Sequence, residues 1–436
     1  MILVIDSGTT NTKAFFFDHR GNIVAGTASP TKTFHLLSGK VEQRAEDWWK
    51  SAVEAIKKLR LQKHPEIEAI VTSSQGGTFV ALDKGLKPLG PGITWLDNRA
   101  ESIAKGLDSK YGKDFFFRKT GHYLEGWCPT AVILWLQKNE PVPFHRIRRI
   151  SFVADYLNQK LTGRFFIDQT AAGMTSFFNI NSGDWDKELL DIVRMKKETL
   201  PELIPAGSIG GKLNREAANI LNLKEGIPVI SGGHDQYCAS LGAGAVGPGD
   251  CLISCGTAWA LLVCTKKPVF KTNSFWSPGR HLKKDYFGLM RAMGDGGVVL
   301  DWLKKNLRFS MDSRLLHAGM TERKYAGIRV PLSIGLERAT LKVEPYFSRG
   351  KGTIRNLSLA SKPEEIYLAA LKALVNEVNA YLEQIRNELV IKKLFLVGGG
   401  AKEPLLAPML SEFTKLKVSV PEVTEAAAKG AALLAL

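Results

Sequence analysis

The sequence predicts an α/β fold made of two related halves, and three observations carry this prediction. Apolar, strand-like runs break into glycines and small hydroxyl residues at three places, over residues 2–18, 252–263 and 393–401. The first two runs resemble each other. The third lies between helical patterns, and strands that alternate with helices and end in glycines indicate a sheet flanked by helices.

The first run is expected to form a β-hairpin with polar groups at its turn. The apolar residues Ile2–Ile5 are followed by Asp6-Ser7-Gly8-Thr9-Thr10, and the chain returns through a second apolar run that ends at Phe17. The second run matches the first position for position when Ser254 is laid over Asp6. Two such hairpins predict an internally duplicated fold, although short strands can also match by chance.

The third run, Lys393–Val397, ends in Gly398-Gly399-Gly400. The stretch Ser361–Glu364 before it reads as a capping box with Pro in the first turn of a long helix. Apolar residues recur in that helix at helical spacing, at Ala370, Leu374, Val378, Tyr381 and Ile385. A helix over 404–413, a strand over 417–420 and a helix over 425–436 with Thr424 as N-cap are expected to follow.

The N-terminal half is expected to contain an amphipathic helix over 47–61 and a buried strand over 69–72 that ends in Ser73-Ser74-Gln75-Gly76-Gly77. The charged, helical stretch from 98 to about 191 is typical of an insertion or a cap over a sheet edge. Turn formers at both ends of Lys224–Pro228 mark the boundary between the halves. The predicted domains are therefore 1–226 and 227–436.

The amino-acid composition limits the classes of protein to which this chain could belong. The 436 residues are 44% hydrophobic and carry a formal net charge of +16, which indicates an ordinary globular protein with a basic surface. The basic residues come in scattered pairs rather than a long tail, so we expect no nucleic-acid partner, and a surface that attracts small polyanions such as nucleotides.

The cysteines and the apolar segments bear on where in the cell the protein is found. Five cysteines form no C-x-x-C pair, which disfavours a disulfide framework or a zinc site and predicts buried thiols in a reducing compartment. The sequence shows no targeting segment and no apolar segment long enough to span a membrane. We therefore expect no membrane partner and a cytoplasmic protein.

Glycine-rich hairpin turns are suited to phosphate because glycine lacks the Cβ that would block the approach of backbone N–H groups. Asp6, at the first turn, could hold Mg²⁺, which prefers one or two carboxylates together with phosphate oxygens. The alternative is that these turns contain glycine only because β-turns need it. Neither a P-loop nor a G-x-S-x-G motif is present.

A second carboxylate is expected at a strand end, in Gly232-Gly233-His234-Asp235-Gln236. Asp235 could accept a proton late in a phosphoryl transfer, or it could serve only as the N-cap of the following helix. The helix terminus predicts a low pKa for Asp235. His234 is expected to be a packing or supporting group, because the side chains of adjacent residues usually diverge.

These motifs together resemble those of the FGGY carbohydrate kinases, in the actin-like, sugar-kinase and Hsp70 superfamily. Asp6–Lys13 resembles the family's first phosphate motif, Ser254–Thr257 the second, and Gly398–Ala401 the adenosine motif, while Asp235 stands at the position of the catalytic aspartate. The resemblance spans nearly the whole chain. It implies duplicated ribonuclease H-like (actin-like ATPase) domains, each a mixed β-sheet flanked by helices, with an interdomain cleft.

The resemblance also implies roles for individual residues. Asp235 would accept the proton from a primary hydroxyl of the sugar, and Asp6 would position Mg²⁺. The residues implied for ATP and its phosphates are Gly8, Thr9, Thr10, Lys13, Gly256, Thr257, Gly398, Gly399 and Gly400. Those implied for the sugar are Gln75, Gly76, Trp95, Asp235 and Gln236.

The acceptor is harder to assign. Xylulokinases usually have Met-His, and glycerol kinases Arg-Glu, where this chain has Gly76-Gly77, and Phe347–Gly352 replaces the family's Gly-Glu-Arg-Pro stretch. A ketopentose such as xylulose or ribulose is the expected acceptor. The alternatives are glycerol, erythritol or a deoxy-ketose, or a non-catalytic sugar or nucleotide sensor. Assembly as a homodimer stays open.

Trp95 could stack on a sugar or belong to the core. Asp97 and Arg99 could bind sugar hydroxyls or form an ion pair within the domain.

Overall fold

The computed structural model describes residues 1–59, 66–256, 258–272, 274–307, 341–346, 351–422 and 425–436, together with the backbone of 324–325 and 328–329. Contacts divide the chain into two compact units, Met1–Val246 with Cys264–Met290 and Glu425–Leu436, and Gly247–Val263 with Arg291–Thr424. The boundary predicted between residues 226 and 227 falls inside the first unit. The last helix, predicted for the C-terminal domain, also belongs to the first unit.

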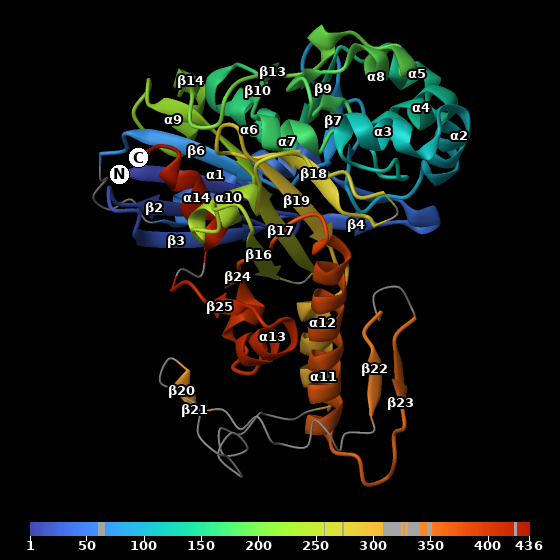
Figure 1. The fold of residues 1–436 in the computed structure, drawn as a ribbon. Coiled ribbons are helices and arrows are strands. Elements are labelled where there is room, and N and C mark those ends of the chain that lie inside the picture. The colour runs from blue at the N-terminus through green and yellow to red at the C-terminus, as the bar shows by residue number, and fades with distance from the viewer. Residues whose placement is uncertain are drawn as a thin grey trace. The chain divides into compact units, whose positions relative to one another are not determined.

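The first unit is organised around a six-stranded mixed sheet in the order β14-β15-β6-β1-β2-β3 (Figure 1). Strands β1, β6 and β15 are parallel to one another, and the other neighbours are antiparallel. The carboxyl ends of the three parallel strands therefore meet at one edge. The bounds are β1 Ile2–Ser7, β2 Asn11–Phe17, β3 Ile23–Pro30, β6 Ala69–Ser74, β14 Ile209–Lys212 and β15 Pro228–His234.

Strand β1 is apolar from Ile2 to Ile5 because both faces of the sheet are covered there. Leu3 and Ile5 belong to one core cluster with Trp48 of α1 (Ala45–Lys58). Ile2 and Val4, which point to the other face, belong to a second cluster with alanines of α14 (Ala426–Leu433). Burial on both faces explains a continuous apolar run in place of an alternating one.

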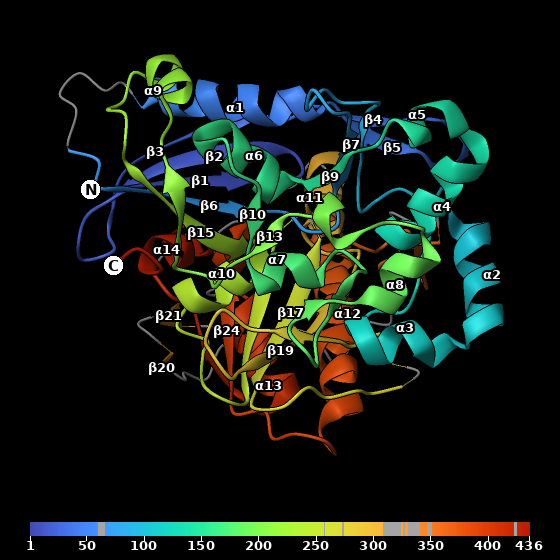
Figure 2. The same ribbon diagram turned by 90° about the horizontal axis from the view of Figure 1, so that it is seen from above.

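Two glycines allow α14 to pack closely against α10 (Asp235–Gly242), and both views show these helices side by side (Figure 2). A Cβ on Gly242 would lie 2.0 Å from the carbonyl oxygen of Ala426, and one on Gly430 would lie 1.8 Å from that of Cys238. Only glycine permits this approach. The helix that begins at Asp235 is therefore held along its length by the C-terminal helix.

The helical insertion expected from residue 98 is present and has a core of its own, which includes Phe79, Phe116, Ile133 and Phe177. A five-stranded sheet in the order β4-β5-β8-β7-β9 lies beside it. The helices are α2 Glu101–Tyr111, α3 Lys113–Thr120, α4 Pro129–Asn139, α5 Pro141–His145, α6 Val153–Thr162, α7 Gln169–Gly173, α8 Lys187–Ile192 and α9 Arg215–Leu221. The strands are β4 Thr33–His35, β5 Val41–Gln43, β7 Phe79–Leu82, β8 Gly92–Ile93 and β9 Arg149–Phe152, with short pairs formed by β10 Phe166–Ile167 and β13 Glu202–Leu203 and by β11 Phe178–Asn179 and β12 Asp184–Trp185. Strands β18 Ser277–Arg280 and β19 Phe287–Ala292 pair antiparallel at one edge of a second six-stranded sheet.

The second unit repeats the central topology of the first. Strand β16 is antiparallel to β17 and parallel to β24, and β24 is parallel to β25. In the first unit, β1 is likewise antiparallel to β2 and parallel to β6, and β6 is parallel to β15. The bounds are β16 Asp250–Cys255, β17 Trp259–Thr265, β20 Lys324–Tyr325, β21 Ile328–Arg329, β22 Lys342–Glu344, β23 Thr353–Arg355, β24 Lys393–Val397, β25 Lys417–Ser419, α11 Gly297–Leu307, α12 Pro363–Ile385 and α13 Leu406–Thr414. The predicted duplication and the mixed sheets flanked by helices are confirmed.

Three details of the prediction were wrong. The hairpins do not match position for position beyond the turn, because Ser7 pairs with Thr12 whereas Cys255 pairs with Trp259, which makes the second turn one residue shorter. Helix α12 starts after Lys362, whose N–H donates to Glu365 at 3.0 Å, so Ser361 is not the N-cap. The last helix has Glu425 as its N-cap residue.

Some predicted features lie outside the described residues: Leu61, Thr257, Thr424 and most of the Phe347–Gly352 stretch. All five cysteines are buried thiols that form no disulfide, as expected. Among the helices that can be described, none combines the length and the apolar character needed to cross a membrane.

Candidate active site

Two carboxylates of the first unit lie at the ends of strands that flank β6. Asp6 is the next-to-last residue of β1, and Asp235 follows β15 directly. In the sheet register, Ser73 of β6 pairs with Asp6 on one side and with Gly233 on the other. The sheet thus brings together two motifs that are more than two hundred residues apart in the sequence.

Asp6 has the character of a cation ligand. Burial and the nearby charge of Asp235 raise its pKa to about 6, against the opposing effects of Lys13 and the Ser73 hydroxyl. Its Oδ1 atom is buried and has no hydrogen-bond partner in the part of the chain that the structure describes. A divalent cation at this oxygen would relieve both features.

Magnesium fits this single carboxylate. Within the described residues, no three His, Cys, Asp or Glu side chains converge as a set of metal ligands. Mg²⁺ commonly takes only one or two carboxylates and fills its other positions with water and phosphate oxygens. Asp6 is therefore suited to a magnesium ion that comes with a nucleotide, and not to a metal held by protein groups alone.

Lys13 lies across the hairpin from Asp6 and pairs with a carboxylate. Its Nζ atom lies 2.6 Å from Oε2 of Glu425, the residue before α14. Both side chains are about one-third exposed. A phosphate that approached Lys13 would therefore compete with Glu425 for the ammonium group.

Asp235 is the first residue of α10, and His234 occupies the N-cap position, so the alternative reading of Asp235 as the N-cap was wrong. The predicted low pKa was wrong as well. Burial raises the pKa of Asp235 to about 6, although hydrogen bonds from Gln236 oppose the shift. Loss of hydration outweighs the helix terminus here, and the carboxylate is a base poised close to neutral pH.

His234 lies against Asp235. Its Nε2 atom is 3.3 Å from Oδ1 of Asp235, so the adjacent side chains converge where divergence was expected. Burial lowers the pKa of His234 to about 4, which leaves the imidazole neutral at physiological pH. The expectation of a supporting group next to Asp235 agrees with this contact.

A hydrogen-bond network ties the first turn to the segment after β6. The Thr9 hydroxyl donates to Oε1 of Gln75 at 2.9 Å, and the Trp95 indole N–H donates to the Thr9 hydroxyl at 3.1 Å. Gln75 donates in turn to Oε1 of Gln43 at 3.1 Å, and Gln43 donates to the Thr9 carbonyl at 2.8 Å. The half-buried Trp95 is therefore fixed at the turn. Gln43 was missed because its strand is too short to give a pattern.

Asp97 and Arg99 form the ion pair that was one of the two alternatives. Arg99 lies 2.8 Å from Asp97 and 2.6 Å from Glu42, and the side chains of Asp97 and Arg99 are buried. Asp97 also accepts a hydrogen bond from the backbone N–H of Val41. These contacts join β5 to the segment after β8, which makes the pair structural.

The glycines after Gln75 are closely packed. A Cβ on Gly76 would lie 2.7 Å from Cδ2 of His234 and 2.5 Å from Cγ of Met174, and one on Gly77 would lie 2.8 Å from the Trp127 ring. His122, whose ring packs edge-on against Trp127, has its pKa lowered to about 4 by burial and by His234. His122, Trp127 and Met174 gave no motif in the sequence, and only the fold places them here.

In the second unit, the glycine segments at the ends of β16 and β24 come together, since Ser254 pairs with Val397. A Cβ on Gly398 would lie 2.9 Å from the carbonyl oxygen of Cys255, and one on Gly400 would lie 2.9 Å from the Cβ of Cys255. A Cβ on Gly399 would meet nothing within 4 Å. Gly256 is exposed directly after β16. The unit therefore offers an open backbone surface at these two strand ends.

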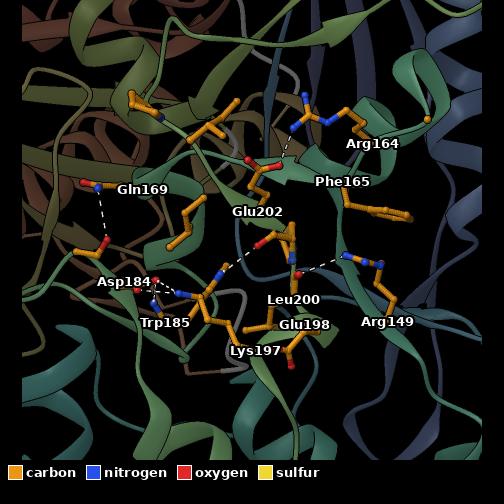
Figure 3. A pocket seen from close by; sticks show the side chains of 16 residues that line it. Arg149, Arg164, Phe165, Gln169, Asp184, Trp185, Lys197, Glu198, Leu200 and Glu202 are labelled. Atoms are coloured by element: carbon orange, nitrogen blue, oxygen red, sulfur yellow. Dashed lines mark hydrogen bonds and ion pairs between the residues drawn. The ribbon is translucent and has the colours of Figure 1, made fainter.

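The first unit also has a large groove, which neither Asp6 nor Asp235 lines (Figure 3). Its volume is about 920 Å³, and none of the predicted site residues lines it. Two ion pairs line it: Arg164 lies 2.7 Å from Glu202, and Lys197 lies 2.8 Å from Asp184. Because these paired side chains are about half exposed, they lack the burial that raises the pKa of Asp6.

The duplicated sheets, with carboxylates at the strand ends of the first one, have the architecture of the actin-like fold class. Comparison with known proteins then identifies the family. The N-terminal domain of the FGGY family of carbohydrate kinases matches residues 1–242, and the C-terminal domain matches residues 251–436. The chain belongs to this family, and it is an ATP-dependent phosphotransferase that acts on a sugar hydroxyl.

The relatives differ in their named substrates. A gluconokinase of Bacillus subtilis is 25% identical over 455 aligned positions that cover 100% of this chain and 87% of the relative. A glycerol kinase of Borrelia duttonii is 30% identical over 100% of this chain and 89% of its own. A xylulose kinase structure from Lactobacillus acidophilus superposes with a TM-score of 0.88 at 22% identity, covering 100% and 89% of the two chains. The last comparison concerns the fold alone.

Proposed function

We propose that this kinase transfers the γ-phosphoryl group of ATP to a primary hydroxyl of a small neutral sugar, and that the sugar is a ketopentose of the xylulose or ribulose type. The observation that carries the proposal is the placement of Asp6 and Asp235 on the strands that flank β6. Within the part of the chain that the structure describes, Asp6 has a buried oxygen without a hydrogen-bond partner, which suits a cation. Asp235 has a pKa of about 6, which suits a base.

Asp235 would act as that base. A carboxyl with a pKa of about 6 is ionised at neutral pH, and it can accept the proton of the acceptor hydroxyl as that oxygen attacks the γ-phosphorus. The proton moves late, because the transition state of phosphoryl transfer is loose. Gln75 and Gln236 would orient the acceptor, together with Gly76 and Trp95.

The phosphates and the adenosine would be held by the glycine segments. Gly8, Thr9, Thr10 and Lys13 of the first unit would contact phosphate oxygens, and in the second unit Gly256 and Thr257 would do the same. Gly398, Gly399 and Gly400 would let the adenosine lie against the backbone. Asp6 would hold Mg²⁺, which neutralises phosphate charge when it is bound.

Charge favours a neutral acceptor over an aldonate such as gluconate. The site contains two carboxylates, and the imidazoles of His122 and His234 are neutral at physiological pH. Lys13 of the first hairpin pairs with a carboxylate, and so does Arg99 in the segment after β8. The carboxylate of an anionic acceptor would have to displace one of these pairs or lie beside Asp235, which costs free energy.

Release of ADP with a panel of acceptors tests the proposal. We expect kcat/KM with D- or L-xylulose or with D- or L-ribulose to exceed that with glycerol, L-fuculose and D-gluconate by at least about tenfold, which corresponds to roughly 1.4 kcal/mol. A preference for gluconate would contradict the charge argument. A preference for glycerol would leave a neutral acceptor but overturn the assignment to a ketopentose.

A further inference from the structure

We infer that His234 is a positioning residue: its buried imidazole holds the side chain of Asp235 in one orientation, so that a defined carboxylate oxygen faces the acceptor. The inference rests on the proposed role of Asp235 as the base. It gives a specific task to a residue that the sequence indicated to be a packing or supporting group. The His234 ring also lies against the glycine at position 76.

The contact itself is specific. Nε2 of His234 lies 3.3 Å from Oδ1 of Asp235, while the Asp235 side chain as a whole stays 26% exposed. The imidazole thus touches one carboxylate oxygen and leaves part of the group accessible. A carboxylate that can turn freely about its Cβ–Cγ bond would spend part of its time with neither lone pair aimed at the acceptor, and misplacement of this kind slows a reaction.

The imidazole is itself held on several sides. The backbone N–H of His234 donates to the Thr170 hydroxyl at 2.9 Å, and its backbone pairs with Ser74 in the sheet. The ring packs edge-on against Tyr237, with centroids 5.9 Å apart. The side chain is only 6% exposed. A ring fixed in this way can in turn fix its neighbour.

Gly76 completes the arrangement. A Cβ at this position would lie 2.7 Å from Cδ2 of His234, closer than real Cβ contacts. The imidazole therefore occupies the space that any larger residue 76 would fill. The same methyl group would lie 2.5 Å from Cγ and 2.8 Å from Cβ of Met174, so Met174 limits the size of residue 76 as well.

The imidazole acts here by position and not by charge. Burial leaves His234 neutral at physiological pH, as its pKa of about 4 indicates. A neutral ring does not cancel the negative charge that Asp235 needs in order to accept a proton. Within the described residues, Nδ1 has no hydrogen-bond partner, so a ring proton on Nε2, 3.3 Å from Oδ1 of Asp235, avoids placing a buried donor at Nδ1.

Two variants separate positioning from packing. His234→Phe keeps a ring of similar volume but removes both nitrogens, and His234→Gln restores an N–H group near the position of Nε2. With the best acceptor of the panel above, we expect His234→Phe to lower kcat by roughly 10- to 100-fold with little change in KM for acceptor or ATP. His234→Gln should recover most of kcat. Wild-type kcat in the Phe variant, or an equal loss in both variants, would overturn the inference.

A third variant keeps every nitrogen. Gly76→Ala should push the imidazole away from its place and reproduce the loss of kcat seen in His234→Phe, and the double variant should be no slower than either single one. Full activity in Gly76→Ala, with a crystal structure that shows the imidazole displaced, would contradict the inference, and this result can be obtained even if His234→Phe does not fold.

Crystal structures of the Phe and Gln variants give a readout that needs no acceptor. We expect Asp235 to change its rotamer in His234→Phe and to keep it in His234→Gln, and an unchanged rotamer in the Phe variant would overturn the inference. Asp235→Asn distinguishes a failure of the positioning role of His234 from a failure of Asp235 as the base. If Asp235→Asn is inactive while His234→Phe is fully active, only the positioning role fails, whereas an active Asp235→Asn removes the proposed base itself.

Discussion

The two β-hairpins that open the two units share a topology and differ in chemistry. Strand β1 pairs with one antiparallel and one parallel neighbour, and β16 does the same. At the matching strand ends, however, the first unit has Asp6 and the second has Ser254. A sheet can therefore be duplicated while the charged group at its edge is kept in only one copy.

The strands beside these hairpins differ in the same way. The glycines after β6 are packed against side chains, His234 on one and Trp127 on the other. Those after β24 are packed against the backbone of Cys255, and Gly399 faces open space. The first unit has thus surrounded its strand ends with functional side chains, while the second has kept bare backbone, which suits a nucleotide.

Asp235→Asn should have the largest effect, because it removes the proposed base itself. We expect kcat to fall by roughly 10³-fold, as for the loss of a general base. ATP affinity should change little, since the glycine segments are untouched. ADP release and calorimetric titration with ATP measure the two quantities, and near-normal turnover would exclude Asp235 as the base.

Asp6→Asn against Ser254→Ala tests the comparison directly, because the two residues occupy equivalent places in the two hairpins. We expect Asp6→Asn to lower kcat by roughly 100-fold and to raise the Mg²⁺ concentration required for half-maximal rate. Ser254→Ala should leave both near the wild-type values. Magnesium titrations of the rate provide the measurement. Equal losses in the two variants would mean that the hairpins have not diverged as we propose.

Most of the fold could be predicted because its signals are local. Apolar runs that end in glycines located β1, β2, β16, β17 and β24, and helical spacing in α12 gave residues that are buried in the structure, such as Leu374 and Val378. The shorter second turn could not be seen, since a single deletion in a turn leaves the apolar pattern intact. Helix α14 belongs to the first unit because Gly430 allows it to pack closely against α10 at Gly242. Packing between residues so far apart leaves no periodic signal in the sequence.

The candidate site was predicted in part. Asp6, Gln75 and Asp235 stood in motifs, and the fold brings their strand ends together. The pKa of Asp235 was predicted in the wrong direction because a sequence shows the helix terminus but not the burial that outweighs it. The convergence of His234 on Asp235 depends on backbone angles at the end of β15, which residue types alone do not specify.

The pH dependence of kcat/KM should be set by Asp235 of the first unit. With a pKa of about 6 for Asp235, kcat/KM should fall about tenfold per pH unit below pH 6 and level off above it, because only the ionised form accepts a proton. A pH–rate profile checks this expectation. A profile that stays flat down to pH 4.5 would show that burial does not raise this pKa.

Stability should change with pH in the opposite sense. The folded-state pKa values of Asp6 and Asp235, about 6, exceed the ordinary value of 3.8, so the folded first unit binds these protons more tightly than the unfolded chain does. The contribution to stability is fully present below pH 4 and is lost as pH rises through 6. Hydrogen exchange in β1 and β15, corrected for intrinsic rates, should show this loss, and the double variant Asp6→Asn with Asp235→Asn should reduce it. The loss that remains is expected from Asp155 and Asp168 of the same unit, whose pKa values burial raises to about 7 and about 6.

Gly398→Ala and Gly399→Ala should have separate effects, although both glycines lie in one segment. Gly398 has φ +87° and ψ 179°, a conformation that is essentially restricted to glycine, so alanine should destabilise the second unit by about 1–3 kcal/mol. An alanine at Gly399 meets nothing within 4 Å and should leave stability within about 0.5 kcal/mol of the wild type. If adenosine lies against that open backbone, however, the added methyl group should raise KM for ATP. Hydrogen exchange in β16 and β24 together with ATP kinetics would reveal this separation, and an unchanged KM in Gly399→Ala would place the nucleotide away from this surface.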